Sequence, residues 1–173
     1  MRRERALEGK NSGAIQLIQT TKEDIQELTR VMTLAFDDDA QKHLGRSKGG
    51  PPGYENGDFF RRWMPYEESV TYEIVADGKV IGGIIVWIYE HGRNVLGTIF
   101  VDPDYQDRGI GTLAWRLIEE THPDTQSWTL GTPSWATKNH HFYEKNGFTK
   151  IREEPAEDIP GGVSFIYSKA MNP

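Results

Sequence analysis

The chain has 173 residues, with 26 acidic against 20 basic side chains and a net charge of −6. This length predicts one domain with a sizeable core, and the acidic balance argues against a surface for duplex nucleic acid, which needs clustered lysine and arginine. The absence of cysteine excludes disulfides, thiolate metal ligands and a cysteine nucleophile.

The apolar runs and the N-terminal residues of the chain indicate the cellular compartment of the protein. The longest apolar run, Ile84 to Tyr89, is too short to span a membrane and suits a buried strand. The basic start, Met1 to Arg5, lacks the apolar segment of a signal peptide. We therefore expect a cytoplasmic protein with a disordered tail at residues 1–13 and a single domain over residues 14–173.

The first quarter of that domain predicts a strand and a long helix. Ile15 to Ile18 is typical of a strand, and Thr20 with Glu23 predicts a capping box at the start of the helix that follows. The apolar stripe of that helix contains Ile25, Leu28, Met32 and Ala35. Because carboxylates near a helix C-terminus oppose the helix dipole, we expect Asp37, Asp38 and Asp39 in the loop beyond it.

The next segment predicts a loop, a short helix and three strands. Residues 45–57 contain five glycines and two prolines, which is typical of a loop. Asp58 is expected to cap a short helix that stops before Pro65. Strands at residues 70–75 and 80–89 flank Asp77-Gly78, a strong hairpin signal, and a third strand at residues 95–101 completes a meander.

The second half alternates helices and strands. The pattern predicts helices at residues 109–120 and 136–146, with Gly147 as the stop of the second, and strands at residues 127–130, 148–152 and 163–168. This order of elements predicts an α+β fold, in which helices flank a mixed central sheet.

The loop before residue 109 carries the strongest ligand signal. Gly109 and Gly111 let several backbone N–H groups converge without obstruction by a Cβ atom. Those groups are the unpaired donors of the helix's first turn, where the dipole is positive, and Arg108 adds a charge nearby. The segment from Gln106 to Thr112 therefore predicts a site for a phosphate or pyrophosphate.

From these residues alone, three interpretations of the loop compete. Gly109-x-Gly111-x-x-Ala114 fits the dinucleotide-binding pattern in form, but seven residues separate Val101 from Gly109 and no acidic residue ends a strand about 20 positions on. A P-loop would need Gly-Lys-Ser/Thr, which this loop lacks. The third interpretation is a glycine-rich helix cap that binds no ligand.

Two blocks of sequence resemble the GNAT superfamily of N-acetyltransferases. Gln106-Asp107-Arg108-Gly109-Ile110-Gly111 is similar to the family's acetyl-CoA motif, Gln/Arg-x-x-Gly-x-Gly/Ala, and Val101 to Tyr105 resembles the strand end before it. About 30 residues later, Asn139 to Phe148 resembles the family's later helix and the strand after it. The resemblance covers the chain from about residue 14 to its end and implies the GNAT fold, with a mostly antiparallel sheet.

The resemblance implies how acetyl-CoA binds. In the family, the strands corresponding to residues 99–101 and 127–130 splay apart and hold the cofactor between them. The implied contacts are the backbone of the earlier strand for pantetheine and the N–H groups from Asp107 to Thr112 for pyrophosphate, and no metal is implied. The implied cofactor-binding residues are Ile99, Phe100, Val101, Gln106, Asp107, Arg108, Gly109, Ile110, Gly111, Thr112, Asn139 and Tyr143.

Acetyl transfer to an amine needs a neutral amine, a donor for the oxyanion and a proton for the departing thiolate. Tyr143 matches the family's thiolate-facing tyrosine and is the candidate catalytic residue, a general acid. Asn139 lies one turn earlier on the same helix face. Because many family members carry an asparagine at the position of Ala136, Asn139 is the candidate to replace it.

No general base is indicated. The strand at residues 94–101 has no acidic residue, although the family often uses a glutamate there. Glu90, His91, His140 and His141 are equally explained as solvated side chains, and a water chain to bulk solvent could serve instead. The implied acceptor pocket, residues 36–65, contains Asp37, Asp38, Asp39 and Tyr54, which could bind a cationic amine or form a solvated loop.

The resemblance implies an acetyl-CoA-dependent N-acetyltransferase, acting on a primary amine of a small molecule or an exposed amino group by direct attack in a ternary complex. The alternative is a non-catalytic acyl-CoA-binding sensor or interaction module of the same fold, which Ala136 and the missing strand acid leave open. Expected partners are acetyl-CoA and an amine, without nucleic acid or membrane. A homodimer and a monomer are both compatible with the sequence.

Overall fold

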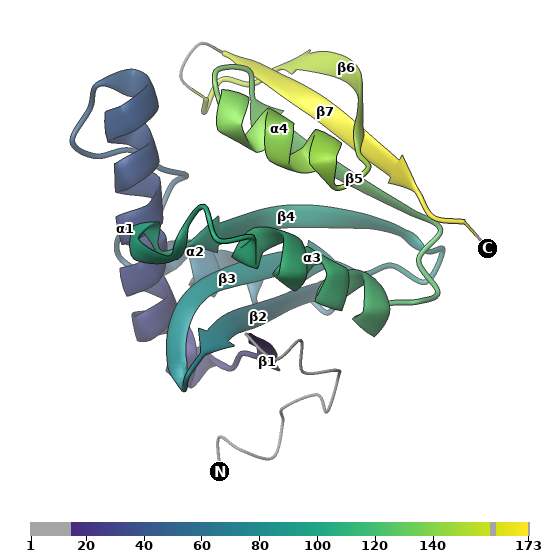
Figure 1. Cartoon of the computed structure of the whole chain (residues 1–173), viewed down its shortest axis with the longest axis horizontal. Helices are drawn as coiled ribbons and strands as arrows, with labels where there is room; N and C mark the ends of the chain where they lie inside the picture. Colours follow the sequence, from purple (N-terminus) through teal and green to yellow (C-terminus); the bar gives the residue numbers. More distant parts are fainter. Residues whose placement is uncertain (1–14, 160–161, 173) are drawn as a thin grey trace.

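The computed structural model describes residues 15–159 and 162–172, so the predicted tail at residues 1–13 lies outside it. Its centre is a seven-stranded sheet with strand order β1-β2-β3-β4-β5-β7-β6 (Figure 1). The strands are β1 (Gln16–Gln19), β2 (Ser69–Ala76), β3 (Lys79–Trp87), β4 (Arg93–Val101), β5 (Ser127–Pro133), β6 (Thr149–Pro155) and β7 (Val163–Ala170). All neighbours are antiparallel except β4 and β5. The predicted α+β fold with a mixed, mostly antiparallel sheet is therefore confirmed, and the single domain over residues 14–173 stays a prediction.

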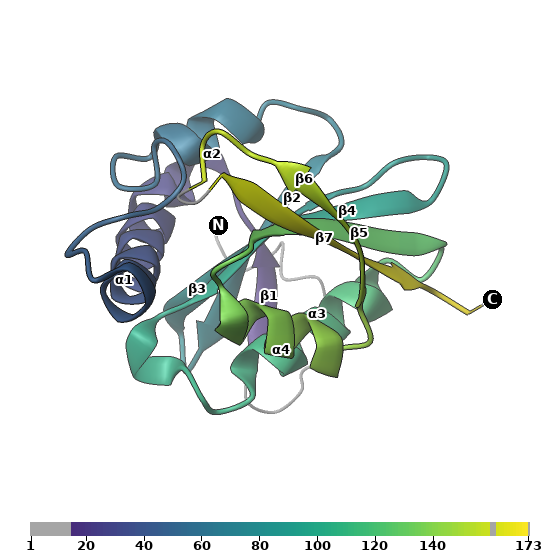
Figure 2. The ribbon, with the colours of Figure 1, turned by 90° about the horizontal axis from the view of Figure 1, so that it is seen from above.

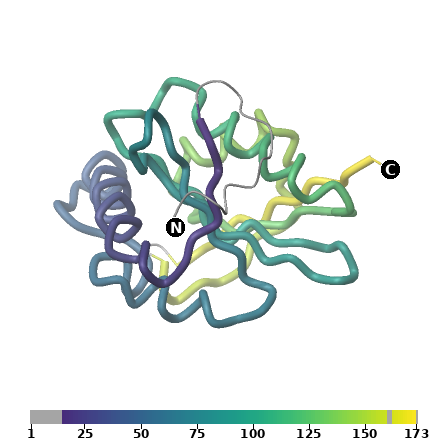
Figure 3. The backbone as a smooth tube through the Cα atoms, turned by 90° about the horizontal axis from the view of Figure 1, so that it is seen from below, coloured from purple at the N-terminus to yellow at the C-terminus, as the bar shows by residue number. Residues whose placement is uncertain are grey.

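Helices cover both faces of this sheet. They are α1 (Ile25–Leu44), α2 (Asp58–Trp63), α3 (Ile110–Thr121) and α4 (Thr137–Lys145), with short 3-10 turns at η1 (Lys22–Asp24) and η2 (Pro103–Tyr105). Helices α1 and α2 lie on one side and α3 and α4 on the other (Figure 2). Seen from below, the chain leaves β1 and turns into α1 beside the sheet (Figure 3). Within the described ranges, no helix is both long and apolar enough to cross a bilayer.

The core has two parts, one on each face. On one face Leu28 and Met32 of α1 pack with Phe60 and Phe100. On the other face α3 carries Trp115, whose ring meets that of Trp128 edge-on at 5.0 Å between centroids. Burying these aromatic and aliphatic side chains supplies about 1.5–3 kcal/mol each, so both helices are fixed to the sheet by their apolar stripes.

Helix α3 also joins the two ends of the sheet. Trp115 contacts Phe148, the residue before β6, with 5.5 Å between ring centroids. Its indole N–H donates to Oε1 of Glu119 at 2.6 Å, and the same carboxylate oxygen accepts from Lys169 of β7. Since α3 also packs against β1 through the same core cluster, its back surface spans strands from both halves of the sheet.

The predicted start of the first helix was wrong by one residue. The capping box consists of Thr21 and Asp24, with the Thr21 N–H donating to Oδ2 of Asp24 at 2.9 Å. The Thr20 hydroxyl instead donates to the carbonyl of Thr71 in β2 at 2.9 Å. Two adjacent threonines fit the capping pattern equally well, and pairing of β1 with β2 decides between them. Asp58 is likewise shifted: it is the first residue of α2, and Gly57 is the cap.

The prediction that Asp37, Asp38 and Asp39 lie beyond α1 was also wrong. The helix runs to Leu44 and ends at Gly45, whose φ of 63° is left-handed. Two of the three carboxylates have partners that offset the helix dipole: Asp38 pairs with Lys42 at 2.7 Å, and Asp37 accepts from the Tyr54 hydroxyl at 2.6 Å. The third carboxylate, Asp39, faces the cavity described below.

A half-buried histidine makes stability depend on pH. His122, at the end of α3, lies 3.0 Å from the Tyr72 hydroxyl through Nε2, and burial lowers its pKa below the usual 6.5. Below pH 6.5 the unfolded chain therefore binds more protons than the native chain, so the free energy of unfolding should fall as the pH is lowered from 7 toward the native-state pKa.

Urea unfolding between pH 7.5 and 5.5 measures this slope, and His122→Gln should flatten it. Tyr72→Phe is the matched control, because it leaves the histidine half-buried and should keep the slope; equal slopes for His122→Gln and wild type would contradict the assignment.

Candidate functional site

The site lies where the two parallel strands separate. β4 and β5 pair at only three positions, Arg93 with Ser127, Asn94 with Trp128 and Val95 with Thr129. Beyond Val95, the β4 edge that faces β5 has no partner strand within the described chain. Its backbone N–H and C=O groups are therefore available to a ligand that lies along it. The splay predicted from the family resemblance is present.

A buried asparagine fixes the point where the splay begins. The Asn94 side chain accepts from the Tyr89 N–H at 2.9 Å and donates to the Thr125 hydroxyl at 2.8 Å. Thr125 in turn donates to the carbonyl of His122 at 2.8 Å. These bonds connect the turn before β4 to the turn before β5, so the closed end of the groove is held by side chains as well as by strand pairing.

The groove opens into a cavity of about 730 Å³, within the usual range for ligand sites. One wall is β4 from Gly97 to Val101, another is the loop from Tyr105 into the first turn of α3, and the third is the end of β5 with α4. The C-terminal half of α1 and the loop after it close the far end. Phe59 of α2 and residues 158–159 of the β6–β7 loop also line it, so segments far apart in the sequence meet around one space. In the ribbon, α1 lies beside the end of the sheet where β4 and β5 separate (Figure 1).

The glycine loop has the geometry expected for binding an anion. Asp107 and Gly109 both adopt left-handed backbone conformations, with φ of 61° and 74°. Gly109 is the N-cap of α3, so the N–H groups of Ile110, Gly111 and Thr112 begin the helix without intrahelical acceptors. All three residues line the cavity. The positive end of α3 therefore faces the space where the predicted pyrophosphate would lie.

Gln106 and Lys138 connect this loop to its surroundings. The Gln106 amide donates to the carbonyl of Val101 at 3.0 Å and accepts from the Lys138 ammonium at 3.0 Å. Lys138, from α4, also lies 3.5 Å from Oδ1 of Asp107. Gln106 therefore ties the loop to the end of β4 and to α4, which sets the loop's position at the mouth of the cavity.

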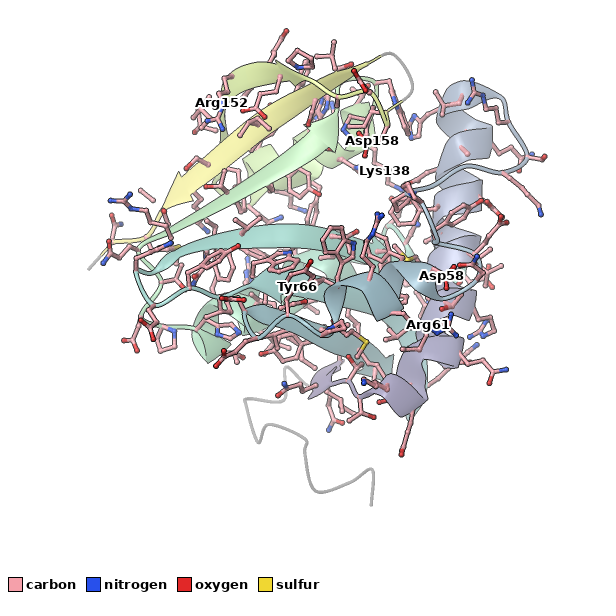
Figure 4. All side chains as sticks on the ribbon, turned by 180° about the vertical axis from the view of Figure 1, so that it is seen from behind. Asp58, Arg61, Tyr66, Lys138, Arg152 and Asp158 are labelled. Atoms are coloured by element: carbon pink, nitrogen blue, oxygen red, sulfur yellow. The ribbon has the colours of Figure 1, made fainter. Side chains whose placement is uncertain are left out.

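Eleven of the twelve predicted cofactor-binding residues line the cavity, and the exception is Arg108. Its guanidinium carbon instead lies 5.4 Å from the centroid of the Tyr105 ring, a cation–π contact. The positive charge beside the loop comes from Lys138, which sequence reasoning missed because it lies about 30 residues away on a different helix. Figure 4 shows Lys138 at the gap between the β5–β7 half and α1.

Tyr143 lies in the wall of the cavity that α4 forms. Its side chain is 8% exposed, and its ring packs against Phe142, Phe148 and Tyr167. Burial raises the pKa of the hydroxyl well above its usual value, and the charges of Asp39 and Tyr167 raise it further. The hydroxyl is therefore protonated at neutral pH. Asn139, one turn earlier, also lines the cavity and approaches the Thr132 hydroxyl at 3.5 Å.

The four side chains considered as general bases differ in whether they line the cavity. Glu90 and His91 lie in the β3–β4 turn away from the cavity, where His91 accepts from the Arg93 N–H at 3.0 Å. His140 contacts the carbonyl of Pro133 at 3.0 Å and packs on Phe165, whereas His141 lines the cavity.

The predicted acceptor segment contributes only part of its residues to the cavity. Phe36, Asp39 and Phe59 line it, together with residues 49–51. Asp37 and Tyr54 instead bond each other within that segment. Asp39 is the functional candidate that the sequence placed in the wrong element. Burial raises the pKa of its carboxyl group, an effect that His43 and Lys138 oppose.

Comparisons with known proteins agree with this geometry. The family model described as "Acetyltransferase (GNAT) family" matches residues 28–148. The Bacillus subtilis protein YrkN, described as uncharacterized, is 32% identical over 141 residues, which cover 80% of this chain and 75% of that protein.

Solved structures share the fold at low sequence identity. The ribosomal-protein-S18-alanine N-acetyltransferase of Escherichia coli superposes with a TM-score of 0.71 at 15% identity, over 92% of this chain and 96% of that chain. The PaiA N-acetyltransferase of Thermoplasma acidophilum, solved in complex with coenzyme A, gives a TM-score of 0.65 at 19% identity, over 91% and 99%.

Proposed function

This chain belongs to the acetyltransferase (GNAT) family, and we propose that it transfers an acetyl group from acetyl-CoA to a primary amine of a small molecule or an exposed amino group. The observation that carries the proposal is the splay of β4 from β5, with the N-terminus of α3 at one end of the resulting cavity and Tyr143 in its wall. The size of the cavity and its several walls favour two substrates bound at once, so that the amine attacks the thioester directly.

The residues present fit acetyl-CoA. Apart from the Val101 carbonyl, which accepts from Gln106, the free edge of β4 from Leu96 to Val101 offers backbone groups to the amides of the pantetheine arm, in the manner of an added strand. The N–H groups of Ile110, Gly111 and Thr112 offer donors to the pyrophosphate. The Thermoplasma PaiA N-acetyltransferase, which shares the fold, was solved in complex with coenzyme A, and this supports acetyl-CoA as the ligand.

Tyr143 supports the catalytic form of this proposal over a binding module. Attack of a neutral amine on the thioester carbonyl forms the C–N bond, and collapse of the adduct breaks the C–S bond and releases a thiolate. A protonated hydroxyl held in the cavity wall can give that thiolate its proton, a step that acid catalysis accelerates. A module that only bound acyl-CoA would gain nothing from a buried proton donor at this position.

Thiol release from acetyl-CoA, followed with a chromogenic disulfide reagent across a panel of primary amines, tests the function. We expect acetyl-CoA-dependent release that saturates with at least one amine, and an N-acetylated product by mass spectrometry. Micromolar binding of acetyl-CoA without release in the presence of any amine would contradict catalysis and would assign the chain as an acyl-CoA-binding module.

A further inference from the structure

We propose that Asp39 takes the proton from the ammonium group of the acceptor, and that the acceptor is therefore a cationic primary amine whose charged end enters the cavity beside α1. This inference rests on the proposed acetyl transfer and adds to it a base and a class of substrate. Its starting point is that Asp39 lines the same cavity as Tyr143 although the two side chains come from different helices, α1 and α4.

The position of Asp39 on α1 separates it from its two acidic neighbours. Ala35, Phe36, Asp39 and Ala40 all line the cavity, which is the spacing of one helix face. Asp37 is held by the Tyr54 hydroxyl at 2.6 Å, and Asp38 pairs with Lys42 at 2.7 Å without lining the cavity. Asp39 is thus the one carboxylate of the triplet that lines the cavity, and Phe36 and Phe59 give the same cavity apolar surface that can contact the carbon chain of an amine.

Three carboxylates line the cavity in the described part of the chain, and they differ in what they can do. Asp107 belongs to the phosphate loop, has a side chain 83% exposed and lies near Lys138. Asp158 is exposed in the β6–β7 loop (Figure 4). Asp39 is partly withdrawn from water, and its charge acts on the hydroxyl of Tyr143. It is therefore the carboxylate best placed to serve the reacting nitrogen.

The charges around Asp39 come from two helices. On α1 it faces His43 and Lys42, which favour the carboxylate, and Asp38, which opposes it; from α4 it faces Lys138 and Tyr143. Burial outweighs the cations and raises the pKa of Asp39 above the usual 3.8. A carboxylate that binds protons more tightly than an ordinary aspartate is a stronger base for the ammonium proton.

The protons balance in the following sequence. The ammonium gives one proton to Asp39, which becomes a neutral acid and later releases that proton to solvent. The neutral amine attacks the thioester carbonyl, and the adduct's nitrogen still carries a positive charge. Tyr143 gives its hydroxyl proton to the departing sulfur as the C–S bond breaks, and the proton lost by the nitrogen restores the tyrosine. The products are the amide, free CoA and one released proton.

Asp39→Asn tests the proposal, with Asp38→Asn as the matched control that removes one neighbouring charge outside the cavity. The probes are acetyl-CoA with n-butylamine and with spermidine, assayed by thiol release from pH 6 to 9.5. At pH 7 we expect kcat/KM to fall about 10²-fold in Asp39→Asn and little in Asp38→Asn, with the Kd for acetyl-CoA unchanged. The deficit should shrink as the pH rises toward the pKa of the amine, because solvent then supplies neutral amine.

Retention of wild-type kcat/KM at pH 7 by Asp39→Asn, or a deficit that is the same at every pH, would overturn the proposal. If Asp39→Asn lowers the melting temperature, the pair Asp39→Glu and Asp39→Gln, which differ in charge at equal size, replaces it; activity in the glutamate variant alone supports the base, and equal activity in both refutes it. Failure of the proposed function is distinct, because the wild-type protein would then bind acetyl-CoA and release no thiol with any amine.

Discussion

Replacement of Tyr143 by phenylalanine is expected to lower turnover roughly 10²–10⁴-fold, the range for loss of a positioned general acid. The ring contacts with Phe142, Phe148 and Tyr167 are retained in the variant. No described residue hydrogen-bonds the hydroxyl, so its loss should change the free energy of unfolding little. Steady-state kinetics with the responsive amine, together with the Kd for acetyl-CoA and the melting temperature, measure these expectations.

How the loss divides between kcat and KM shows whether Tyr143 acts in the transition state or in substrate binding. A fall in kcat and kcat/KM together, at unchanged acetyl-CoA affinity, marks an interaction made only in the transition state. A variant that keeps most of its turnover would remove Tyr143 from the mechanism, since the CoA thiolate is a tolerable leaving group that water can also protonate. Tyr167→Phe is a useful control, because Tyr167 contacts Tyr143 but does not line the cavity.

Replacement of Gly111 by valine is expected to abolish the stabilisation that acetyl-CoA gives the protein. A Cβ atom at Gly111 would lie 3.0 Å from Cε2 and 3.3 Å from Cζ of Phe142, another residue that lines the cavity. The branched side chain must therefore displace that ring or move α3 from α4, and either change deforms the donor array at the start of α3. A ligand present at 100 times its Kd stabilises the wild-type fold by about 2.7 kcal/mol, which thermal unfolding detects readily.

Phe142→Leu in the Gly111→Val background separates packing from binding. The smaller side chain relieves the contact with valine, so the melting temperature without ligand should recover. Binding should stay lost if valine obstructs the phosphate donors directly. Normal acetyl-CoA binding by Gly111→Val alone would show that the phosphate-loop interpretation is wrong.

Local patterns in the sequence were enough for most of the fold. Asp77 and Gly78 both adopt left-handed conformations, with φ of 50° and 76°, as the hairpin signal between β2 and β3 predicted. The end of α1 was predicted too early because the three carboxylates were weighed against the dipole alone, whereas Asp38 pairs with Lys42 and Asp37 accepts from the Tyr54 hydroxyl 17 residues away. The unfavourable dipole interaction of one carboxylate is a small effect, of order 0.3–1 kcal/mol, and a distant hydrogen bond can outweigh it.

In the candidate site, too, the sequence predicted the backbone features but not the positions of long side chains. Spacing in the glycine loop predicted the backbone donors, because backbone geometry follows from residue type at Gly109 and Gly111. It did not predict that Arg108 would stack on Tyr105 or that Lys138 would supply the charge, since the direction of a long side chain depends on neighbours from other elements. Asp39 was named with Asp37 and Asp38 as a possible contact of a cationic amine, but the sequence could not single it out, because its surroundings come from two helices that lie far apart in the sequence.

Helix α3 connects the cavity to the hydrophobic core on its other side. Its N-terminus faces the cavity, while its back surface touches Trp128 of β5, Phe148 before β6 and Lys169 of β7. The helix also contacts β1 and β4, so it packs against both halves of the sheet. Because packed interiors transmit strain instead of absorbing it, we expect substitutions in the core beneath α3 to reach the groove between β4 and β5. Sequence change in that remote core can therefore retune the groove while every residue that lines it stays the same.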